Sequence, residues 1–358
     1  MAKLQVAVLF GGASSEHEVS RVSAAAVAEG ISAEKYDVLT VGITKKGQWF
    51  LYSGPTANMR DGSWEQHPSC VPAVLSADSG VHGLVIFDNA GVQTKYIDIV
   101  FPVLHGRNGE DGTIQGLLQM AGIPYVGCGI LGSALCMDKI TSNRTFDEAG
   151  IAQTEWLAVK SRDAAKVEEI DAKIAEKLGY PVFVKPSVGG SSVGISKVKS
   201  KADLAEALTL AAEHDVNILI ERAIIGQEVE CAVLGNQELF ASLPGEVVSA
   251  NDEMYDYEAK YQSGDASMLY LPAHLPQAKL EEVHDAALRA YEAAGCQGLA
   301  RVDFFVEKET GRVLLNEINT MPGFTPISMY PKLMEMSGLP MQALTEKLLS
   351  LALERTVG

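Results

Sequence analysis

Basic residues are scarce in this sequence. Its 358 residues include 29 Lys and Arg against 46 Asp and Glu, which gives a formal net charge of −17 at pH 7. A nucleic-acid partner is therefore excluded, because binding a phosphate backbone needs an electropositive surface. A small anion such as ATP is still compatible, because a few lysines and a divalent cation can reverse the charge inside one cleft.

Cysteines are few, and long apolar runs are absent. The five Cys residues are scattered without any C-x-x-C pair, which favours free thiols in a reducing compartment over a zinc site or a disulfide framework. No stretch approaches the roughly 20 apolar residues of a membrane span. The N-terminal run MAKLQVAVLFGG is too short for a signal peptide. We therefore expect a cytoplasmic protein that has no membrane partner.

The first part of the chain has the pattern of an α/β unit. Apolar runs at 4–10, 38–43 and 97–104 predict buried strands, and helices are expected at 18–31 and 112–121. Strands that alternate with helices in this way are typical of a parallel sheet. Residues 46–96 are less regular and predict a β insertion.

Two further blocks follow. The second has a predicted helix from 131 to about 149, and a loop PSVGGSSVG between predicted strands at 180–185 and 195–198. The third is richer in strands and contains a polar, Tyr-rich segment at 251–270, which we interpret as a lid because such long loops are usually functional. The other predicted elements are helices at 163–178, 201–213, 277–294 and 340–354, and strands at 125–126, 217–221, 228–234, 238–248, 299–306 and 312–319.

The most informative segment is RVDFFVEKETGRVLLNEINTMPG at 301–323. It predicts a β-hairpin, and pairing Asp303 with Glu317 would place Arg301 opposite Asn319, with all four side chains on one face. Two carboxylates and an amide oxygen suit Mg²⁺. The alternative is an Arg–Asp salt bridge on a solvated face. The opposite, buried face is expected to hold Val302, Phe304, Leu314 and Ile318.

The loop in VFVKPSVGGSSVGI (182–195) offers backbone N–H groups and hydroxyls to phosphate oxygens, and Lys185 adds charge at the strand end. It is not a P-loop, since G-x-x-x-x-G-K-[ST] is absent from the chain. A hairpin without a ligand is the alternative interpretation. Lys139 is either a second phosphate-binding lysine or a surface residue. Glu221 ends one apolar strand and Glu228 begins the next, a place that could receive adenosine, although each alone is more typical of a surface carboxylate.

Three glycine-rich turns remain. GGASSEHEVS (11–20) and HGRNGEDG (105–112) each follow a predicted strand and precede a helix, and ligands bind at such strand ends in open α/β sheets. Glu16 in the first turn lies beside a helix N-terminus. GCGILG (127–132) matches G-x-G-x-x-G, but no acidic residue ends a second strand about 20 residues later, so a dinucleotide fold is disfavoured.

Eight motifs, taken in order, resemble the D-alanine–D-alanine ligases of the ATP-grasp superfamily over nearly the whole chain. They are GGASSEHEVS, HGRNGEDG, MDK, VKPSVGGSSVG, IERAIIGQEVE, YDYEAKY, RVDFFV and NEINTMPGFTPIS. The resemblance implies an α/β fold, α+β in its C-terminal part, with a Rossmann-like N-terminal domain (1–130) before a two-domain ATP-grasp fold (131–221 and 222–358). It also implies a set of site residues. Those for ATP are Lys139, Phe183, Lys185, Gly190, Ser192, Glu221, Ala223, Glu228, Lys260 and Asn316. Those for two Mg²⁺ (or Mn²⁺) ions are Asp303, Glu317 and Asn319.

The remaining implied residues serve the amino-acid substrates. The catalytic set is Glu16, Ser191, Tyr261, Arg301 and Gly323, and His105, Ser328 and Met329 are implied to contact D-alanine. The reaction implied is ATP-dependent joining of two D-alanine molecules through a D-alanyl phosphate, with ADP and phosphate released, for peptidoglycan precursor synthesis. Tyr261 resembles the residue of dipeptide-forming members; D-lactate is the alternative acceptor. A homodimer is expected from the family, and a nucleotide-binding regulator without catalysis is the competing class.

Overall fold

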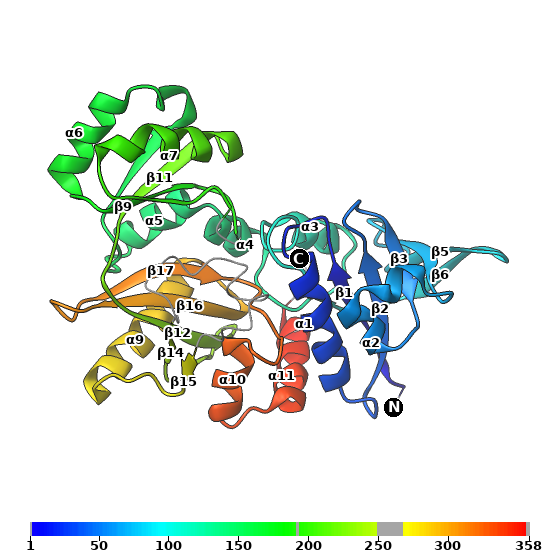
Figure 1. The fold of residues 1–358 in the computed structure, drawn as a ribbon. Coiled ribbons are helices and arrows are strands. Elements are labelled where there is room, and N and C mark those ends of the chain that lie inside the picture. The colour runs from blue at the N-terminus through cyan, green and yellow to red at the C-terminus, as the bar shows by residue number, and fades with distance from the viewer. Residues whose placement is uncertain (1, 191–192, 249–267, 356–358) are drawn as a thin grey trace.

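The computed structural model describes residues 2–190, 193–248 and 268–355, and it contains three β-sheets that follow one another along the chain. The N-terminal sheet lies on one side of the molecule (Figure 1). The central sheet, with its two covering helices, stands apart from it above the C-terminal sheet (Figure 1). Helix α4 (Ile130–Met137) contacts elements of the N-terminal and C-terminal parts, and α5 (Lys139–Glu148) lies between the central and C-terminal parts. The predicted α/β fold class is confirmed.

The N-terminal sheet has the strand order β6-β5-β4-β3-β2-β1-β7, and β1 pairs in parallel with β2 and β7 as predicted. Strand β1 is buried on both faces because its side chains alternate between two apolar clusters. The predicted β insertion is an antiparallel extension through β3 to β6. The elements are β1 (Leu4–Gly11), α1 (His17–Gly30), β2 (Tyr36–Ile43), β3 (Trp49–Tyr52), α2 (Thr56–Asp61), a 3-10 turn (Ser63–Gln66), β4 (Val71–Leu75), β5 (Gly83–Asp88), β6 (Gly91–Tyr96), β7 (Ile99–Pro102) and α3 (Thr113–Met120).

The central sheet is antiparallel, with the order β10-β9-β11-β8. Apolar side chains of α6 and α7 form one cluster with those of the strands. The predicted helix from 131 to 149 is two helices, since Asp138 is extended (φ −92°, ψ 99°) and its carboxylate accepts from the N–H groups of Ile140 and Thr141. The elements are α4 (Ile130–Met137), α5 (Lys139–Glu148), β8 (Trp156–Lys160), a 3-10 turn (Ser161–Asp163), α6 (Val167–Lys177), β9 (Val182–Pro186), β10 (Ser196–Val198), α7 (Lys201–His214) and β11 (Asn217–Arg222).

The C-terminal sheet has the order β15-β14-β12-β16-β17, with β13 beside β12. The strand expected at 238–248 is two short strands. The last three residues of the predicted lid are strand β15 rather than loop, and residues 249–267 lie outside the described part of the chain. The elements are β12 (Gly226–Gly235), β13 (Leu239–Ala241), β14 (Gly245–Val248), β15 (Met268–Tyr270), α9 (Gln277–Ala293), β16 (Gly298–Glu307), β17 (Val313–Asn319), α10 (Met329–Met336) and α11 (Met341–Glu354).

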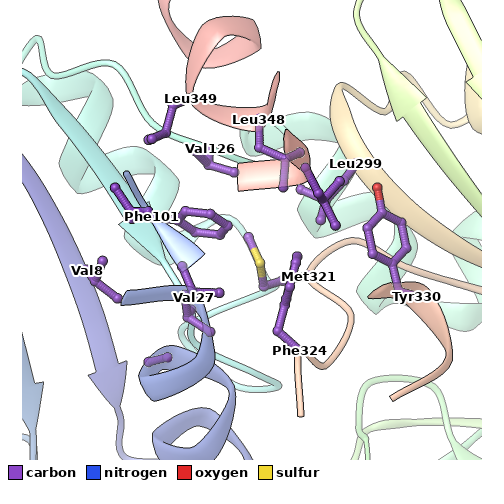
Figure 2. Packing of buried hydrophobic residues seen from close by; sticks show 14 of the residues in the cluster. Val8, Val27, Phe101, Val126, Leu299, Met321, Phe324, Tyr330, Leu348 and Leu349 are labelled. Atoms are coloured by element: carbon purple, nitrogen blue, oxygen red, sulfur yellow. The ribbon is translucent and has the colours of Figure 1, made fainter. Parts of the chain in front are cut away.

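One apolar cluster joins the N-terminal sheet to the C-terminal part. Figure 2 shows Phe101 of β7 beside Met321 and Phe324, which come from the loop after β17. The rings of Phe101 and Phe324 meet edge to face, with centroids 5.8 Å apart. Both rings are fully buried. The loop 320–325 is therefore held against β7 by packing rather than by its own secondary structure. Within the described residues, no helix is long and apolar enough to cross a membrane.

Candidate active site

The hairpin of β16 and β17 carries a compact polar cluster. Arg301 pairs with Asn319 and Asp303 with Glu317, which confirms the predicted register. Arg301 donates from Nε to Oδ1 of Asp303 (2.8 Å) and from Nη2 to Oδ2 (2.6 Å), a two-pronged pair. The Asn319 amide donates to the same carboxylate at 2.9 Å. The Arg–Asp salt bridge that stood as an alternative to a metal site is therefore present.

The cluster carries more negative than positive charge. Glu230 of β12 lies opposite Asp303 and approaches Nε of Arg301 at 3.0 Å. Burial, together with the nearby Glu230 and Glu317 charges, raises the pKa of Asp303 to about 7, and Arg301 opposes this shift. Asp303 and Glu230 thus contact Arg301, and Glu317 lies 3.4 Å from the ammonium of Lys139. A cation bound here would balance the remaining negative charge.

The donor set fits a hard cation only in part. In the described residues, no group of three or more His, Cys, Asp or Glu side chains is arranged to hold a metal ion. Asp303 and Glu317 are two carboxylates, and Asn319 directs its amide nitrogen toward both. Mg²⁺ needs oxygen ligands and usually takes several from water and from phosphates. These three residues therefore suit an ion that arrives with a nucleotide and receives most of its ligands from it.

A β-bulge alters the predicted packing of this hairpin. The register shifts between Asp303 and Phe304, so that Phe304 pairs with Leu315 and the ladder leaves Asn316 unpaired. Leu315, rather than the expected Leu314, packs in the cluster with Val302, Phe304 and Ile318. Leu314 is buried as predicted, but it pairs with Phe305 and so lies on the other face. The bulge also places Asn316 next to Glu317 opposite one residue, Asp303.

Lys139 connects the central segment to this hairpin. Besides Glu317, its ammonium contacts the carbonyl of Gly189 at 3.0 Å. Asp138 holds the same loop, since Ser187 donates to its carboxylate at 2.6 Å and the Lys139 N–H donates to the Ser187 carbonyl. The glycine loop after β9 is therefore tied to the start of α5, and one lysine reaches from there to a predicted metal ligand.

Lys185 and Glu221 form an ion pair between neighbouring strands of the central sheet. Both side chains are about 11% exposed, and the Asn143 amide donates to the other Glu221 oxygen at 3.2 Å. Phe183 lies on the same face of β9 as Lys185, and Lys197 sits 5.9 Å above its ring. The pair is therefore buried beside α5, and Glu221 lies opposite Phe183 in the neighbouring strand.

Beyond β11 the chain turns into β12. The Ala223 N–H already donates to the Pro181 carbonyl at 3.0 Å, so a ligand contact at Ala223 would use its carbonyl oxygen. Glu228 shares a face of β12 with Glu230, and hence with the hairpin cluster. Glu228, one of the predicted adenosine residues, thus lies on the same face of the sheet as the predicted metal residues.

Glu16 lies where three segments approach one another. A Cβ placed on Gly106 would lie 2.4 Å from Oε2 of Glu16, and one placed on Gly190 would lie 3.0 Å from it. The glycine loop of the central segment therefore reaches the start of α1. Gly106 adopts φ +66°, so a side chain is disfavoured there by conformation as well as by space.

Glu110 is a site residue that the sequence prediction missed. Its carboxylate accepts from the N–H of Gly106 (2.8 Å) and from the N–H of Met321 (2.9 Å), and so bridges two parts of the chain. Burial, followed by the charge of Glu16, raises its pKa to about 8. The sequence offered one signal for Glu110, an acidic residue within HGRNGEDG. Its partner Met321 is 211 residues away, so the contact between them could not be predicted from local sequence.

His105 and the loop around Gly323 form a second bridge. Nδ1 of buried His105 is 2.8 Å from the Met321 carbonyl, and Nε2 is 3.3 Å from the Ser23 hydroxyl, which accepts from the Phe324 N–H. Burial lowers the pKa of His105 to about 4, so the ring is neutral at pH 7 and donates from Nδ1. Gly323 therefore lies between Met321 and Phe324, whose backbone groups are both hydrogen-bonded to the N-terminal part of the chain.

Ser328 and Met329 mark the N-terminus of α10. The Ser328 hydroxyl accepts from the Thr325 N–H at 3.0 Å and lies 2.8 Å from the Thr325 hydroxyl. Met329 is buried and approaches Gly245 of β14. A helix N-terminus is a suitable place for a carboxylate. Helix α10 itself was not predicted from the sequence.

Four predicted site residues lie outside the described part of the chain, namely Ser191, Ser192, Lys260 and Tyr261. Most of the others fall into groups centred on the hairpin, on the glycine loop with the nearby Lys185–Glu221 pair, and on Glu16, whereas Ser328 and Met329 lie at the N-terminus of α10. Residues that the sequence prediction missed are Ser23, Glu110, Asn143 and Glu230.

Comparisons with known proteins find the same family along nearly the whole chain. The family described as "D-ala D-ala ligase N-terminus" matches residues 5–128, and "D-ala D-ala ligase C-terminus" matches residues 145–350. The chain is 49% identical over 354 residues to the D-alanine--D-alanine ligase of Thermoanaerobacter sp. (strain X514), covering 99% of this chain and 98% of that protein.

Two solved structures are similar throughout. VanG D-Ala:D-Ser ligase from Enterococcus faecalis has a TM-score of 0.89 at 39% identity and covers 98% of this chain and 100% of its own. The D-alanine-D-alanine ligase from Coxiella burnetii has a TM-score of 0.85 at 34% identity, with 99% of this chain and 95% of that one covered.

Proposed function

The chain belongs to the D-alanine–D-alanine ligase family, and we propose that it joins two D-alanine molecules with ATP, releasing ADP and phosphate. The main support in the structure is the position of Lys139. Its ammonium lies between the glycine-loop carbonyl of Gly189 and Glu317 of the hairpin. A lysine in that place can hold transferring phosphate oxygens beside the acidic cluster.

In the first half-reaction, the carboxylate of the first D-alanine attacks the γ-phosphorus of ATP, and D-alanyl phosphate and ADP are formed. Catalysis of phosphoryl transfer is mainly positioning and charge neutralisation. Lys139, Lys185 and the glycine loop with Gly190, Ser191 and Ser192 hold the phosphates, and Lys260 joins them. Phe183, Glu221, Ala223 and Glu228 surround the adenosine.

The acidic hairpin is proposed to receive divalent cations with the nucleotide. Asp303, Glu317 and Asn319 would hold Mg²⁺ or Mn²⁺, with Asn316 beside them on the bulge, and the cation would neutralise charge on the phosphates. Asn319 must then turn its amide oxygen toward the ion. Arg301 must also share Asp303, since it now contacts both oxygens of that carboxylate.

In the second half-reaction, the amine of the second D-alanine attacks the acyl carbon, the C–N bond forms and phosphate leaves. Arg301 and the Gly323 N–H stabilise the oxyanion of the tetrahedral intermediate. Glu16 holds the ammonium of the first D-alanine, with His105 nearby. Ser328 and Met329 at the start of α10 receive the carboxylate of the second, and Ser191 with Tyr261 close the acceptor site.

The domain ranges 1–130, 131–221 and 222–358, a homodimer and a cytoplasmic location belong to the same proposal. The three sheets follow these ranges, except that β11 of the central sheet extends by one residue, to Arg222. The cytoplasm is where a cell keeps the ATP that the reaction uses, and the peptidoglycan precursor is the expected destination of the dipeptide.

The function is tested by phosphate release and product identification. Purified protein with ATP and Mg²⁺ is given D-alanine alone, L-alanine alone, or D-alanine with D-serine or D-lactate. We expect release with D-alanine alone and D-alanyl-D-alanine as product. D-Serine is included because the similar Enterococcus faecalis structure is named as a D-Ala:D-Ser ligase. If phosphate is released only when D-serine or D-lactate is added, the chain is still a ligase, but the assignment of D-alanyl-D-alanine as its product is refuted.

Arg301→Lys separates an enzyme from a nucleotide-binding regulator. Lysine keeps the charge but loses the two-pronged contact to Asp303 and the planar donor for the oxyanion. We expect turnover to fall by about 10²-fold or more, as for loss of an oxyanion donor, with little change in ATP affinity. The matched control is Arg312→Lys on the same hairpin, which pairs with Glu155 at the surface. Equal effects from both variants would contradict the role of Arg301.

A further inference from the structure

Two segments that contain glycine, 127–132 and 295–298, pack backbone against backbone where the N-terminal, central and C-terminal parts meet. A Cβ placed on Gly298 would lie 3.1 Å from the nitrogen of Gly127, and one placed on Gly132 would lie 3.0 Å from the carbonyl oxygen of Gly295. The G-x-G-x-x-G match at 127–132 is therefore a close-packing feature. Its partner segment, 295–298, reads GCQG.

This close packing brings three thiols together. Cys128, Cys136 and Cys296 are 1%, 7% and 5% exposed. The sulfur of Cys136 on α4 lies 3.9 Å from that of Cys296 in the turn before β16. The Gln297 N–H points at the sulfur of Cys128 from 3.5 Å. Cys128 and Cys136 thus line one contact with Cys296, which is 160 residues beyond Cys136 in sequence.

We propose that Cys136 and Cys296 are a modification site, at which a hydroperoxide converts the two thiols into a reversible disulfide that ties α4 to the turn before β16. A disulfide needs its sulfurs about 2 Å apart, so they must approach each other by about 2 Å. The two backbones already touch at Gly132 and Gly295, one helical turn from Cys136. Side-chain rotation and a small shift of α4 provide the rest.

The reaction balances with one peroxide. Hydrogen peroxide oxidises one thiol to a sulfenic acid; its O–O bond breaks and water leaves. The second thiol then attacks that sulfur, the S–S bond forms, and the hydroxyl leaves as a second water. The two sulfurs lose two electrons in total, and one peroxide gains them.

A polar hollow of about 760 Å³ offers the oxidant a route among the described residues. Gly129, Gln297 and Arg355 are part of its lining. Gln297 follows Cys296, so the hollow reaches the residue next to one of the two thiols of the proposed disulfide, and Gly129 brings it next to Cys128 as well. Hydrogen peroxide is little larger than water and suits this route better than bulkier oxidants.

The disulfide would stabilise the fold. It closes a loop of 160 residues and so restricts the unfolded chain. Because the two sulfurs are already 3.9 Å apart before oxidation, we expect only small displacements at the site residues downstream of each cysteine, Lys139 and Arg301. We therefore expect a higher unfolding temperature, by a few degrees, with turnover changed less than twofold.

The experiment treats folded full-length protein with hydrogen peroxide, removes the peroxide with catalase, and alkylates free thiols in denaturant. We expect two of the five cysteines to escape alkylation, and peptide mapping to join Cys136 to Cys296 until dithiothreitol is added. Cys128→Ser and Cys231→Ser should still form this link, and Cys296→Ala should not. The wild-type peptide map decides the question even if a variant folds poorly. Alkylation of both Cys136 and Cys296, or a link that joins another pair, would overturn the proposal.

Discussion

Replacing Glu110 by Gln tests how the site receives the ammonium of the first D-alanine. Glu110 and Glu16 lie on either side of Gly106, and the charge of Glu16 helps to raise the pKa of Glu110 to about 8. An ammonium bound between them favours both carboxylates in their ionised form. Affinity for D-alanine should therefore rise as Glu110 loses its proton.

The size of this effect follows from the pKa. At pH 7 roughly one Glu110 in eleven is ionised, and at pH 8.5 roughly three in four are. If only the ionised form binds, the apparent dissociation constant falls by the ratio of these fractions, roughly eightfold. A neutral glutamine removes the titrating group, so Glu110→Gln should lose this dependence. It also leaves one of the two backbone N–H groups poorly satisfied, which costs about 1–3 kcal/mol of stability.

The assay measures the KM of the first D-alanine between pH 7 and pH 8.5, with phosphate release as the readout, for the wild type and for Glu110→Gln. Glu18→Gln is the matched control, because Glu18 lies at the start of the same helix as Glu16 and pairs with Lys45 at the surface. The control should keep the eightfold change. If Glu110→Gln also keeps it, then Glu110 is not the titrating group and the reasoning is wrong.

The same pKa shift has a consequence for stability. The folded-state pKa of Glu110 is above its ordinary value of 4.5, so the folded protein binds the proton more tightly than the unfolded chain does. The free energy of unfolding should therefore decrease as the pH rises from about 4.5 to about 8. Glu110→Gln should flatten this part of the profile, which thermal or urea unfolding at several pH values would measure.

Two other variants test the packing and the central ion pair. Phe324→Ala removes a fully buried ring from the cluster between β7 and the loop after β17, and it should lower the free energy of unfolding by about 3–5 kcal/mol. Urea unfolding checks this against Phe87→Ala, whose ring is half exposed and whose cost should be below about 1 kcal/mol. Lys185→Met leaves Glu221 buried without its cation, so it should cost about 3–5 kcal/mol and raise the KM for ATP. Lys185→Met combined with Glu221→Gln should recover part of the stability but not the KM; recovery of both would argue against a phosphate-binding role for Lys185.

The local elements could be predicted because their signals are local. The alternation of apolar and polar residues at 301–319 fixed the hairpin, its face and the pairing of Asp303 with Glu317. The bulge could not be predicted in the same way, because one extra residue in β17 is decided by how Leu315 packs beneath the sheet. The break at Asp138 did have a signal, since Asp is a preferred N-cap residue, but the apolar pattern on both sides of it favoured one continuous helix.

The site residues that were missed share a different property: each acts through a partner that is distant in the sequence. Glu110 is held by the Met321 N–H, and Ser23 accepts from the Phe324 N–H across 301 residues. Both contacts depend on the apolar cluster that presses the loop 320–325 against β7 (Figure 2). That cluster holds Gly323 between Met321 and Phe324, whose backbone groups bond to the N-terminal part of the chain. The N–H proposed to bind the oxyanion is therefore positioned by the N-terminal part, whereas Arg301 is positioned by the C-terminal sheet. Packing between the parts is thus a condition for the chemistry, and Phe324→Ala should lower kcat by more than its loss of folded protein explains.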